Sequence, residues 1–191
     1  MKKLNSKAFT LIELLAVITI MGILMIVAIP SVSRVIENTR RDNFLDTAKQ
    51  YANGVKTMWI SDSLQCGSNV ASAVTDGAYY VPIDSANVGK TVSGVNYPTI
   101  LEQGGKSSWG SKEVQGYVLV VVSGAATGNA KTSYHVYLSD GTHGVSNDTT
   151  VSLDLKRADV SVSGVSYKTK PTGNKNINGK TYSSYTVCKE V

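Results

Sequence analysis

The sequence has few charged residues and few of the residues on which most enzyme chemistry depends. Only 17% of its 191 residues are Asp, Glu, Lys or Arg, and it contains two histidines and two cysteines. It has no phosphate-binding glycine loop ending in Lys and Ser or Thr, no G-x-S-x-G and no H-E-x-x-H. We therefore expect no catalytic residues and no cofactor, and we predict that the protein is not an enzyme.

The histidines and cysteines are also too few for the common metal sites. His135 and His143 lie on either side of a predicted turn and have no fixed third ligand, so we expect no metal site. Cys66 and Cys188 lack C-x-x-C spacing, which argues against zinc and thioredoxin-like roles. In an exported protein they can pair across a loop of about 120 residues, which stabilises a fold by at most about 5 kcal/mol. Two unrelated thiols are the alternative.

The abundant residues differ along the chain. Tyrosine outnumbers phenylalanine by 10 to 2, and beyond about residue 60 the chain is rich in Val, Thr, Ser, Tyr and Gly. This composition is typical of strands and turns. The net charge of +5 is spread unevenly, because residues 1–60 carry +4, residues 61–160 carry −3 and residues 161–191 carry +4.

A long apolar run lies near the N-terminus. It extends over 22 residues from Phe9 to Pro30, and Lys2, Lys3 and Lys7 precede it. As a helix it is about 33 Å long, enough to cross the hydrocarbon core of a bilayer. The preceding lysines favour a cytoplasmic N-terminus. Because the run is long and no A-x-A-like site follows it, a membrane-spanning helix is the better interpretation, with a secretory signal peptide as the alternative.

A single charge interrupts this run. Glu13 is the only formally charged residue between Lys7 and Arg34. A carboxylate buried in hydrocarbon without a partner costs several kcal/mol. We therefore expect Glu13 to have a partner, which need not belong to the same chain. The alternative is a carboxylate that is protonated or reaches the lipid headgroups.

The segment K-A-F-T-L-I-E-L, with Gly22 and Pro30 further along the helix, resembles the N-terminal motif of type IV pilins and pseudopilins. The resemblance covers about residues 7–35. It implies that a membrane-embedded prepilin peptidase cuts between Ala8 and Phe9 and methylates the new amino group of Phe9. The family usually has glycine before the cut. Ala8 departs from that pattern, and we expect slower cleavage there.

The resemblance also implies roles for residues within the run. Glu13 lies one helical turn after Phe9, so in a filament its carboxylate would meet the Phe9 amine of a neighbouring subunit and define the axial register. Gly22 and Pro30 weaken the helix between them. In pilins of this type that segment melts during packing into the filament, so the resemblance implies melting here. A proline kink in one continuous helix is the alternative.

After Pro30 the sequence becomes amphipathic, with apolar residues at three- and four-residue steps and charged residues between them. We predict that the helix continues to about Ile60, where Ser61 and Asp62 begin a turn-forming stretch. Gly54 is expected to weaken its end. The predicted apolar stripe consists of Val32, Val35, Ile36, Thr39, Leu45, Ala48, Ala52, Val55 and Trp59.

The remaining chain predicts an antiparallel sheet connected by hairpins. Tyr117–Val122 is continuously apolar and is expected in the middle of the sheet. Ser133–Leu138 alternates between apolar and polar residues, and Asn178-Gly179 is the strongest hairpin signal. The helix stripe is the expected cover for the apolar face of the sheet. Further strands are predicted at Ala78–Ile83, Val92–Ile100, Val151–Leu155, Val160–Val162, Val165–Lys168 and Tyr182–Val187.

The C-terminal end is basic and contains tyrosines. Lysines among tyrosines are typical of surfaces that bind DNA or an anionic glycan. The alternative is a solvated loop that keeps this part soluble or complements the acidic middle of a neighbouring subunit. The candidate ligand surface consists of Lys168, Lys170, Lys175 and Lys180, with Tyr167, Tyr182 and Tyr185 nearby.

These features predict an α+β protein in which a long N-terminal helical spine packs on an antiparallel β-sheet head, as in type IV pilins. The resemblance implies a structural subunit, a major pilin, of a type IV pilus that serves adhesion, motility or DNA uptake. The expected parts are a leader peptide at residues 1–8, a transmembrane and filament-core helix at 9–30, an amphipathic helix packing on the head at 31–61, and the β-rich head at 62–191.

The implied partners are further copies in a helical filament, the prepilin peptidase and the pilus assembly machinery. The protein is expected in the bacterial cell membrane as a single-pass precursor and then in an extracellular pilus. A pseudopilin of a type II secretion or competence system is one alternative, although no compact Asp-rich loop suggests a calcium site near the C-terminus. A membrane-anchored surface-binding module is another.

Overall fold

The computed structural model describes residues 10–102, 105–110, 112–147, 153–162, 167 and 169–191. The chain divides into two compact units, residues 1–39 and 40–191. One α-helix, α1 (Leu11–Ile60), begins in the first unit and ends in the second. It is helical through both Gly22 and Pro30 and ends at the predicted residue.

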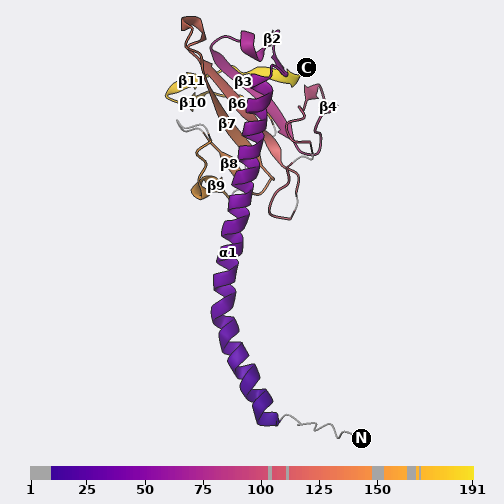
Figure 1. Ribbon diagram of the computed structural model, residues 1–191, viewed down its shortest axis with the longest axis vertical. Coiled ribbons are helices and arrows are strands. Elements are labelled where there is room, and N and C mark those ends of the chain that lie inside the picture. The colour runs from indigo at the N-terminus through magenta and orange to yellow at the C-terminus, as the bar shows by residue number, and fades with distance from the viewer. Residues whose placement is uncertain (1–9, 103–104, 111, 148–152, 163–166, 168) are drawn as a thin grey trace, which may run out of the picture. The chain divides into compact units, whose positions relative to one another are not determined.

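The second unit is built on an eight-stranded sheet with the order β2-β1-β12-β3-β6-β7-β8-β9 (Figure 1). Neighbouring strands are antiparallel, except that β12 runs parallel to β3. The strands are β1 (Leu64–Cys66), β2 (Asn69–Val70), β3 (Gly77–Asp84), β6 (Gln115–Ser123), β7 (Lys131–Ser139), β8 (Gly144–Ser146), β9 (Val160–Ser161) and β12 (Thr186–Glu190). The α+β class predicted from the sequence is confirmed.

Two small hairpins and three 3₁₀ turns accompany this sheet. The hairpins are β4 (Thr91–Val92) with β5 (Val95–Asn96), and β10 (Lys175–Ile177) with β11 (Lys180–Tyr182). The 3₁₀ turns are η1 (Ala71–Ala73), η2 (Ala125–Thr127) and η3 (Arg157–Asp159).

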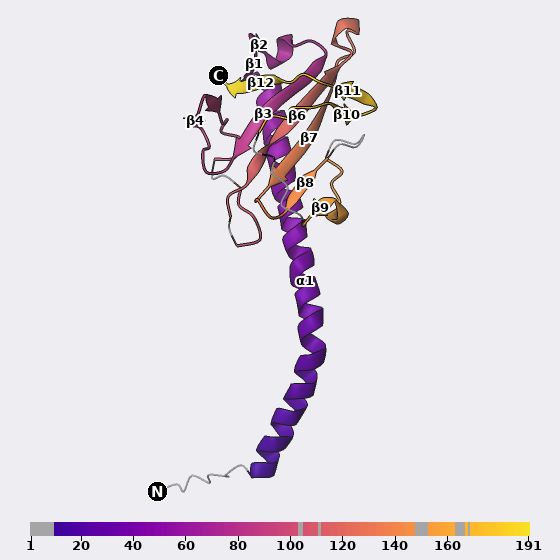
Figure 2. The ribbon, with the colours of Figure 1, turned by 180° about the vertical axis from the view of Figure 1, so that it is seen from behind.

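The part of α1 within the second unit covers one face of the sheet. It lies in front of the sheet in Figure 1 and behind it in Figure 2. Its buried residues recur at three- and four-residue steps, as an amphipathic helix requires. They are Phe44, Leu45, Ala48, Tyr51, Ala52, Val55 and Trp59.

This buried stripe differs from the predicted one at two points. It begins at Phe44, whereas the predicted stripe began at Val32, and Val32 is 55% exposed. It is also wider than a single row, because Phe44 lies beside Leu45 and Tyr51 beside Ala52. Tyr51 is not a member of the predicted stripe, yet its ring is buried and its hydroxyl accepts a hydrogen bond from the Gly105 N–H at 2.9 Å.

Two distant loops hold the start of the packed part of α1. Arg157 in η3 binds both carboxylate oxygens of Asp42, at 2.8 and 2.5 Å. The Ser108 hydroxyl donates to the Arg40 carbonyl at 2.6 Å, and the Trp109 ring packs edge-on against Phe44. These contacts join segments more than 60 residues apart to the same stretch of helix.

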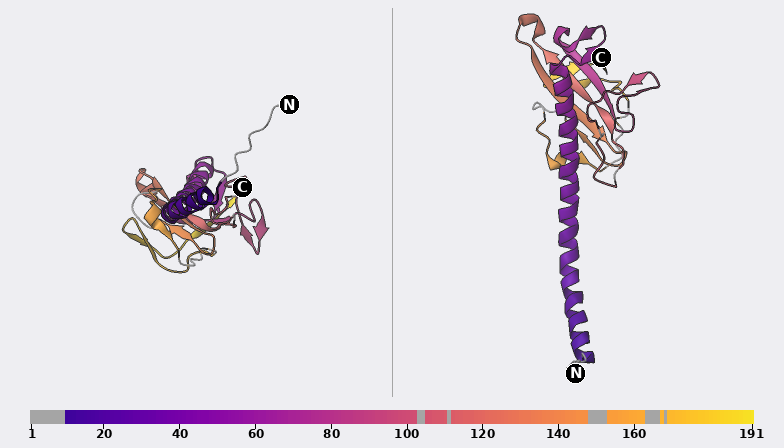
Figure 3. Two further views of the ribbon diagram at one scale, coloured as in Figure 1. Left: turned by 90° about the horizontal axis from the view of Figure 1, so that it is seen from below. Right: turned by 45° about the vertical axis from the view of Figure 1, so that its right-hand side comes forward.

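The central strand β6 is buried on both faces, as its continuous apolar sequence predicted. Val118, Val120 and Val122 belong to the core that α1 covers, and Leu119 and Val121 belong to a second core on the opposite face. The alternation follows from the two-residue period of a strand. The sheet is therefore the middle layer of three, which the end-on view in Figure 3 shows.

The C-terminal hairpin β10–β11 supplies the third layer. Asn178 and Gly179 form its two-residue turn with φ values of 53° and 78°, the conformation that an Asn-Gly hairpin signal predicts. Beneath it the rings of Tyr117 and Tyr137 stack at 4.6 Å, and the edge of Tyr167 meets both. The excess of tyrosine over phenylalanine thus reflects, in part, an aromatic core at the edge of solvent.

Several strand predictions were wrong or incomplete. Residues 92–100 do not form one strand, because Ser93 and Gly94 adopt left-handed conformations and turn the chain between β4 and β5. The strand predicted at 182–187 is interrupted between β11 and β12. Residues 153–155 are not in a strand, while residues 151–152 lie outside the described residues, as does most of 165–168. The parallel placement of β12 was not predicted.

The structure shows why a glycine, Gly54, lies near the end of α1 although it lowers the stability of a helix. A Cβ atom at Gly54 would lie 2.5 Å from Ile100 Cγ2 and 2.9 Å from the Ile100 carbonyl oxygen. Such distances are shorter than van der Waals contact. Gly54 therefore permits the loop that contains Ile100 to approach the helix closely.

Gly54→Ala is expected to destabilise the head by about 1–3 kcal/mol, because the overpacking outweighs the gain in helix propensity. Urea unfolding of the full chain in detergent, followed by the fluorescence of Trp59 and Trp109, measures the change. Gly173→Ala is the matched control, since nothing lies within 4 Å of a Cβ there. Equal stability of the two variants would contradict the packing role.

Candidate functional site

The first unit presents an apolar helical surface. The large apolar side chains from Leu11 to Ile36 are each between 46% and 88% exposed. By length and composition α1 contains a segment able to cross a membrane. Contiguous apolar surface on this scale is unusual for a monomer in water and marks a membrane or protein contact. These residues are Leu11, Ile12, Leu14, Leu15, Val17, Ile18, Ile20, Met21, Ile23, Leu24, Met25, Ile26, Val27, Ile29, Val32, Val35 and Ile36.

The one carboxylate in this surface caps the helix. The N–H and the hydroxyl of Thr10 both donate to Oε2 of Glu13 at 2.8 Å. In return the Glu13 N–H donates to the Thr10 hydroxyl oxygen at 3.3 Å. This is a reciprocal capping box, and the T-x-x-E spacing in the sequence is its signal. Thr10 is therefore a partner of Glu13 within the chain that was not predicted.

Gly22 and Pro30 lie within the continuous helix. Nothing is within 4 Å of a Cβ placed on Gly22, so no packing in the described monomer requires glycine there. Pro30 has no N–H to donate to the carbonyl one turn earlier, which weakens the helix locally. Both residues therefore leave the helix locally less stable. Ala8 and Phe9, the predicted cleavage pair, lie outside the described residues.

Cys66 and Cys188 form a disulfide, as the pairing hypothesis predicted. They face each other across the antiparallel pair of β1 and β12, with Cα atoms 4.0 Å apart. Both residues are buried. The bridge joins the first strand after α1 to the last strand, which lies between β1 and β3. It thus fastens the end of the chain inside the sheet.

The predicted lysine and tyrosine ligand surface is not assembled as expected. Tyr182 and Tyr185 are only 8% and 5% exposed, so their ring faces are not open for stacking on bases. The Tyr185 hydroxyl oxygen lies 2.9 Å from the backbone carbonyl oxygens of both Gly173 and Tyr182, so its single proton is shared between two acceptors. The aromatic part of that prediction is therefore wrong, because these tyrosines pack in the second core.

The lysines of that surface serve different local contacts. Lys170 donates to the Tyr185 carbonyl at 3.2 Å. Lys175 lies 4.1 Å from the ring centroid of Tyr137, and Lys180 lies 5.5 Å from that of Tyr182. Lys168 lies outside the described residues. Cation–π contacts of this kind fix the ammonium groups near the third layer.

The two histidines do not form a pair. His135 is fully buried on β7, where its ring nitrogens contact the Ser133 hydroxyl at 2.9 Å and the Asn147 carbonyl at 3.0 Å. The His143 ring instead stacks on the Trp109 ring, with ring centroids 3.8 Å apart, and it contacts the Asp140 carboxylate. In the described part of the chain no group of three His, Cys, Asp or Glu side chains is placed to hold a metal ion.

Asp140 joins the turn after β7 to the loop that packs on α1. Its side chain is buried, and it accepts hydrogen bonds from the N–H groups of Thr142 and His143 and from the Ser107 hydroxyl, at 2.8, 2.6 and 2.5 Å. Burial raises the pKa of Asp140, but the His143 N–H, the Ser107 hydroxyl and the Thr142 N–H together lower that pKa below its ordinary value. The folded state therefore favours the ionised carboxylate.

Comparison with known proteins identifies the N-terminal segment. Residues 3–29 match the family model of the prokaryotic N-terminal methylation motif, which is the signature of type IV pilins and pseudopilins. The search of the curated proteins and the search of the solved structures each found no match. The motif and the helix-on-sheet layout define a class, the type IV pilins and their relatives.

The motif supports a type IV pilin-like or pseudopilin-like protein. The motif implies processing by a prepilin peptidase and assembly into a pilus-like system. With the apolar N-terminal helix, it fits a membrane-anchored precursor that is later assembled at the surface.

Removing the disulfide is expected to destabilise the head. The bridge spans a separation of 122 residues in the sequence, for which the chain-entropy model gives at most about 5 kcal/mol. The Cys66→Ala/Cys188→Ala variant should unfold at lower urea and be cleaved faster by protease near β12. Free thiols in the exported wild-type protein would contradict the bridge.

Asp140→Asn is expected to cost about 1–3 kcal/mol at pH 7, the range for a disrupted buried hydrogen-bond partner. Because the folded-state pKa is lowered, the carboxylate stabilises the fold above its unfolded-state pKa of about 4 and loses this effect as the pH falls through the folded-state value. The stability difference should narrow below about pH 4. Urea unfolding at several pH values measures it, with exposed Asp154→Asn as control. Parallel pH profiles for wild type and Asp140→Asn would exclude this role.

Proposed function

We propose that the protein is a structural subunit, a major pilin, of a type IV pilus and that it is not an enzyme. The observation that carries this proposal is the methylation motif at the start of an exposed apolar helix. An apolar surface from Leu11 to Ile36 needs lipid around the precursor and sibling subunits around the assembled form. The β-rich unit, whose apolar faces are covered by α1 and the C-terminal hairpin, would form the filament surface.

Processing would prepare the helix for assembly. We propose that a prepilin peptidase cuts between Ala8 and Phe9 and methylates the Phe9 amine. The new cationic group would then directly precede Thr10, the residue that holds the Glu13 carboxylate in the described chain. The Glu13 carboxylate would pass from Thr10 to the Phe9 amine of a neighbouring subunit. A charge that finds this partner only in one axial position favours one register.

The helix between Gly22 and Pro30 would melt during packing. Gly22 has open space around its Cβ position, and Pro30 removes a backbone hydrogen bond. Neither property stabilises the described helix, so both fit a segment that must change conformation when neighbouring helices surround it.

The assembled filament would lie outside the cell and serve adhesion, motility or DNA uptake. A pseudopilin of a type II secretion or competence system shares the motif and remains the second candidate. A membrane-anchored surface-binding module is the third, and it would keep its N-terminal leader. Long surface filaments that contain this chain favour the first candidate over both others.

Replacing Glu13 separates its two roles. Glu13→Gln keeps a side chain able to complete the capping box but removes the charge. We expect membrane insertion to persist and surface filaments to be lost or shortened, as counted by electron microscopy of sheared material. Thr10→Val is the matched control, since it removes the cap hydroxyl and keeps the charge. Normal filaments from Glu13→Gln would refute the pairing role.

A further inference from the structure

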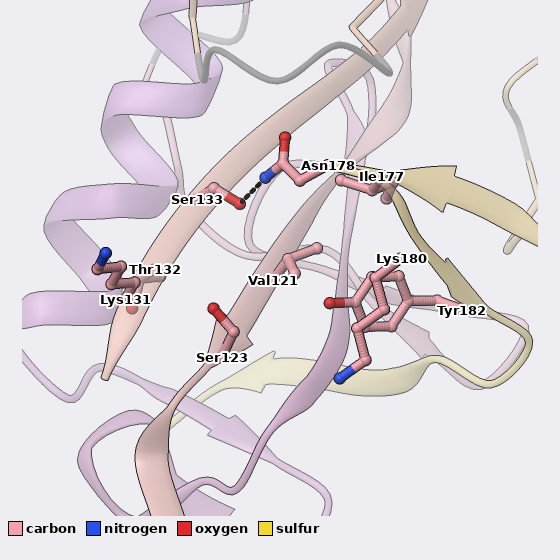
Figure 4. Close-up of a pocket in the computed structure, with 9 residues that line it drawn as sticks. All are labelled: Val121, Ser123, Lys131, Thr132, Ser133, Ile177, Asn178, Lys180 and Tyr182. Atoms are coloured by element: carbon pink, nitrogen blue, oxygen red, sulfur yellow. Dashed lines mark hydrogen bonds between the residues drawn. The ribbon is translucent and has the colours of Figure 1, made fainter. Parts of the chain in front are cut away.

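The outer face of the sheet contains a pocket of about 330 Å³ beside the β10–β11 hairpin (Figure 4). Three segments line it: the end of β6, the start of β7, which follows β6 after a short connection, and the hairpin itself. Its apolar lining includes Val121 and Ile177, both buried in the second core. The Tyr182 ring borders the same space. All of these residues lie in the second unit, so the pocket does not depend on the N-terminal helix.

The charge of this pocket is positive. Lys131 from β7 and Lys180 from the hairpin line it from different elements, and none of its lining residues is acidic. Among the described residues neither lysine takes part in a salt bridge. Two ammonium groups beside an apolar floor attract an anion, and no protein carboxylate within the lining competes for them.

Asp76 interacts electrostatically with Lys180, but its carboxylate is bound to backbone groups outside the pocket lining. Asp76 accepts hydrogen bonds from the N–H groups of Ala125 and Gly124, at 2.7 and 3.0 Å. These backbone bonds, with a smaller contribution from the charge of Lys180, lower the pKa of Asp76. Its carboxylate therefore stabilises the turn after β6, and Asp76 does not line the pocket.

Neutral polar groups complete the lining. The Ser133 hydroxyl lies between β7 and the hairpin, where the Asn178 amide donates to it over a long 3.4 Å. Ser123 and the Tyr182 hydroxyl add further donors and acceptors. Hydroxyl and amide groups in this arrangement match the alternating donors and acceptors of a sugar ring.

We propose that this pocket binds a carboxylated pyranose, a uronic acid or sialic acid residue of a glycan. The hydroxyl and amide groups bind the hydroxyls of the ring, and the positive charge of Lys131 and Lys180 attracts its carboxylate. The volume lies at the small end of ligand pockets, which span about 300–1,000 Å³, and therefore suits one sugar residue.

The same features disfavour nucleic acid. Binding of single strands relies on exposed aromatic rings on which bases stack. Tyr182 is only 8% exposed, and the Lys180 ammonium lies 5.5 Å from its ring centroid. The pocket therefore offers hydrogen bonds and charge without an open stacking surface.

Titration calorimetry on the full chain in detergent micelles tests the proposal. The probes are trigalacturonic acid and 3′-sialyllactose as the two carboxylated sources, lactose and maltotriose as neutral sugars, and a 12-nucleotide single-stranded DNA. We expect saturable binding of at least one carboxylated probe and none of the neutral sugars. Lys131→Gln and Lys180→Gln should each weaken that binding about tenfold, as expected for the loss of one charge-assisted hydrogen bond.

Two exposed lysines outside the pocket, Lys90 and Lys189, supply matched controls. Lys90→Gln and Lys189→Gln remove the same charge and should leave affinity unchanged. Circular dichroism confirms that each variant is folded. The proposal is overturned by equal binding of neutral and carboxylated sugars, by preference for DNA, by the absence of all binding, or by equal effects of pocket and control variants. Because the monomer in detergent is tested, the result is independent of filament formation.

Discussion

Water does not stabilise an exposed apolar helix, and this constraint organises the whole chain. The large apolar side chains from Leu11 to Ile36 are exposed, so the segment needs lipid or other subunits around it. The rest of α1 needs no partner outside the chain, because its apolar stripe from Phe44 to Trp59 is buried against the sheet. One helix thus carries two apolar surfaces, one satisfied within the chain and one left for partners.

The last strand of the head, β12, is held inside the sheet by its neighbours and by the disulfide. β12 lies between β1 and β3 and is bonded to β1 through Cys66 and Cys188. The segment that emerges from α1 is therefore linked covalently to the end of the chain. The remaining apolar face of the sheet is covered by the tyrosine-rich third layer, whose edge contains the positively charged pocket.

Sequence patterns predicted the elements whose physics is local. Apolar periodicity placed the end of α1 at Ile60, continuous apolar sequence placed β6 inside the sheet, and Asn178-Gly179 marked its hairpin. Features that depend on distant contacts were missed. The parallel pairing of β12 with β3 joins segments about 100 residues apart, and the burial of Tyr182 and Tyr185 depends on the third layer. The Thr10–Glu13 cap follows from the local T-x-x-E spacing, which is the signal of a capping box, although it was not predicted.

The central claim is that the apolar helix becomes an assembly surface through processing at its start. Intact-mass and peptide mass spectrometry of the protein taken from the cell surface test this claim most directly. The account predicts a mature chain that begins at Phe9 and carries one methyl group on its α-amine. Cys66 and Cys188 are joined in a disulfide in this chain. A surface protein that retains Met1 would contradict it and would instead indicate a permanently anchored module.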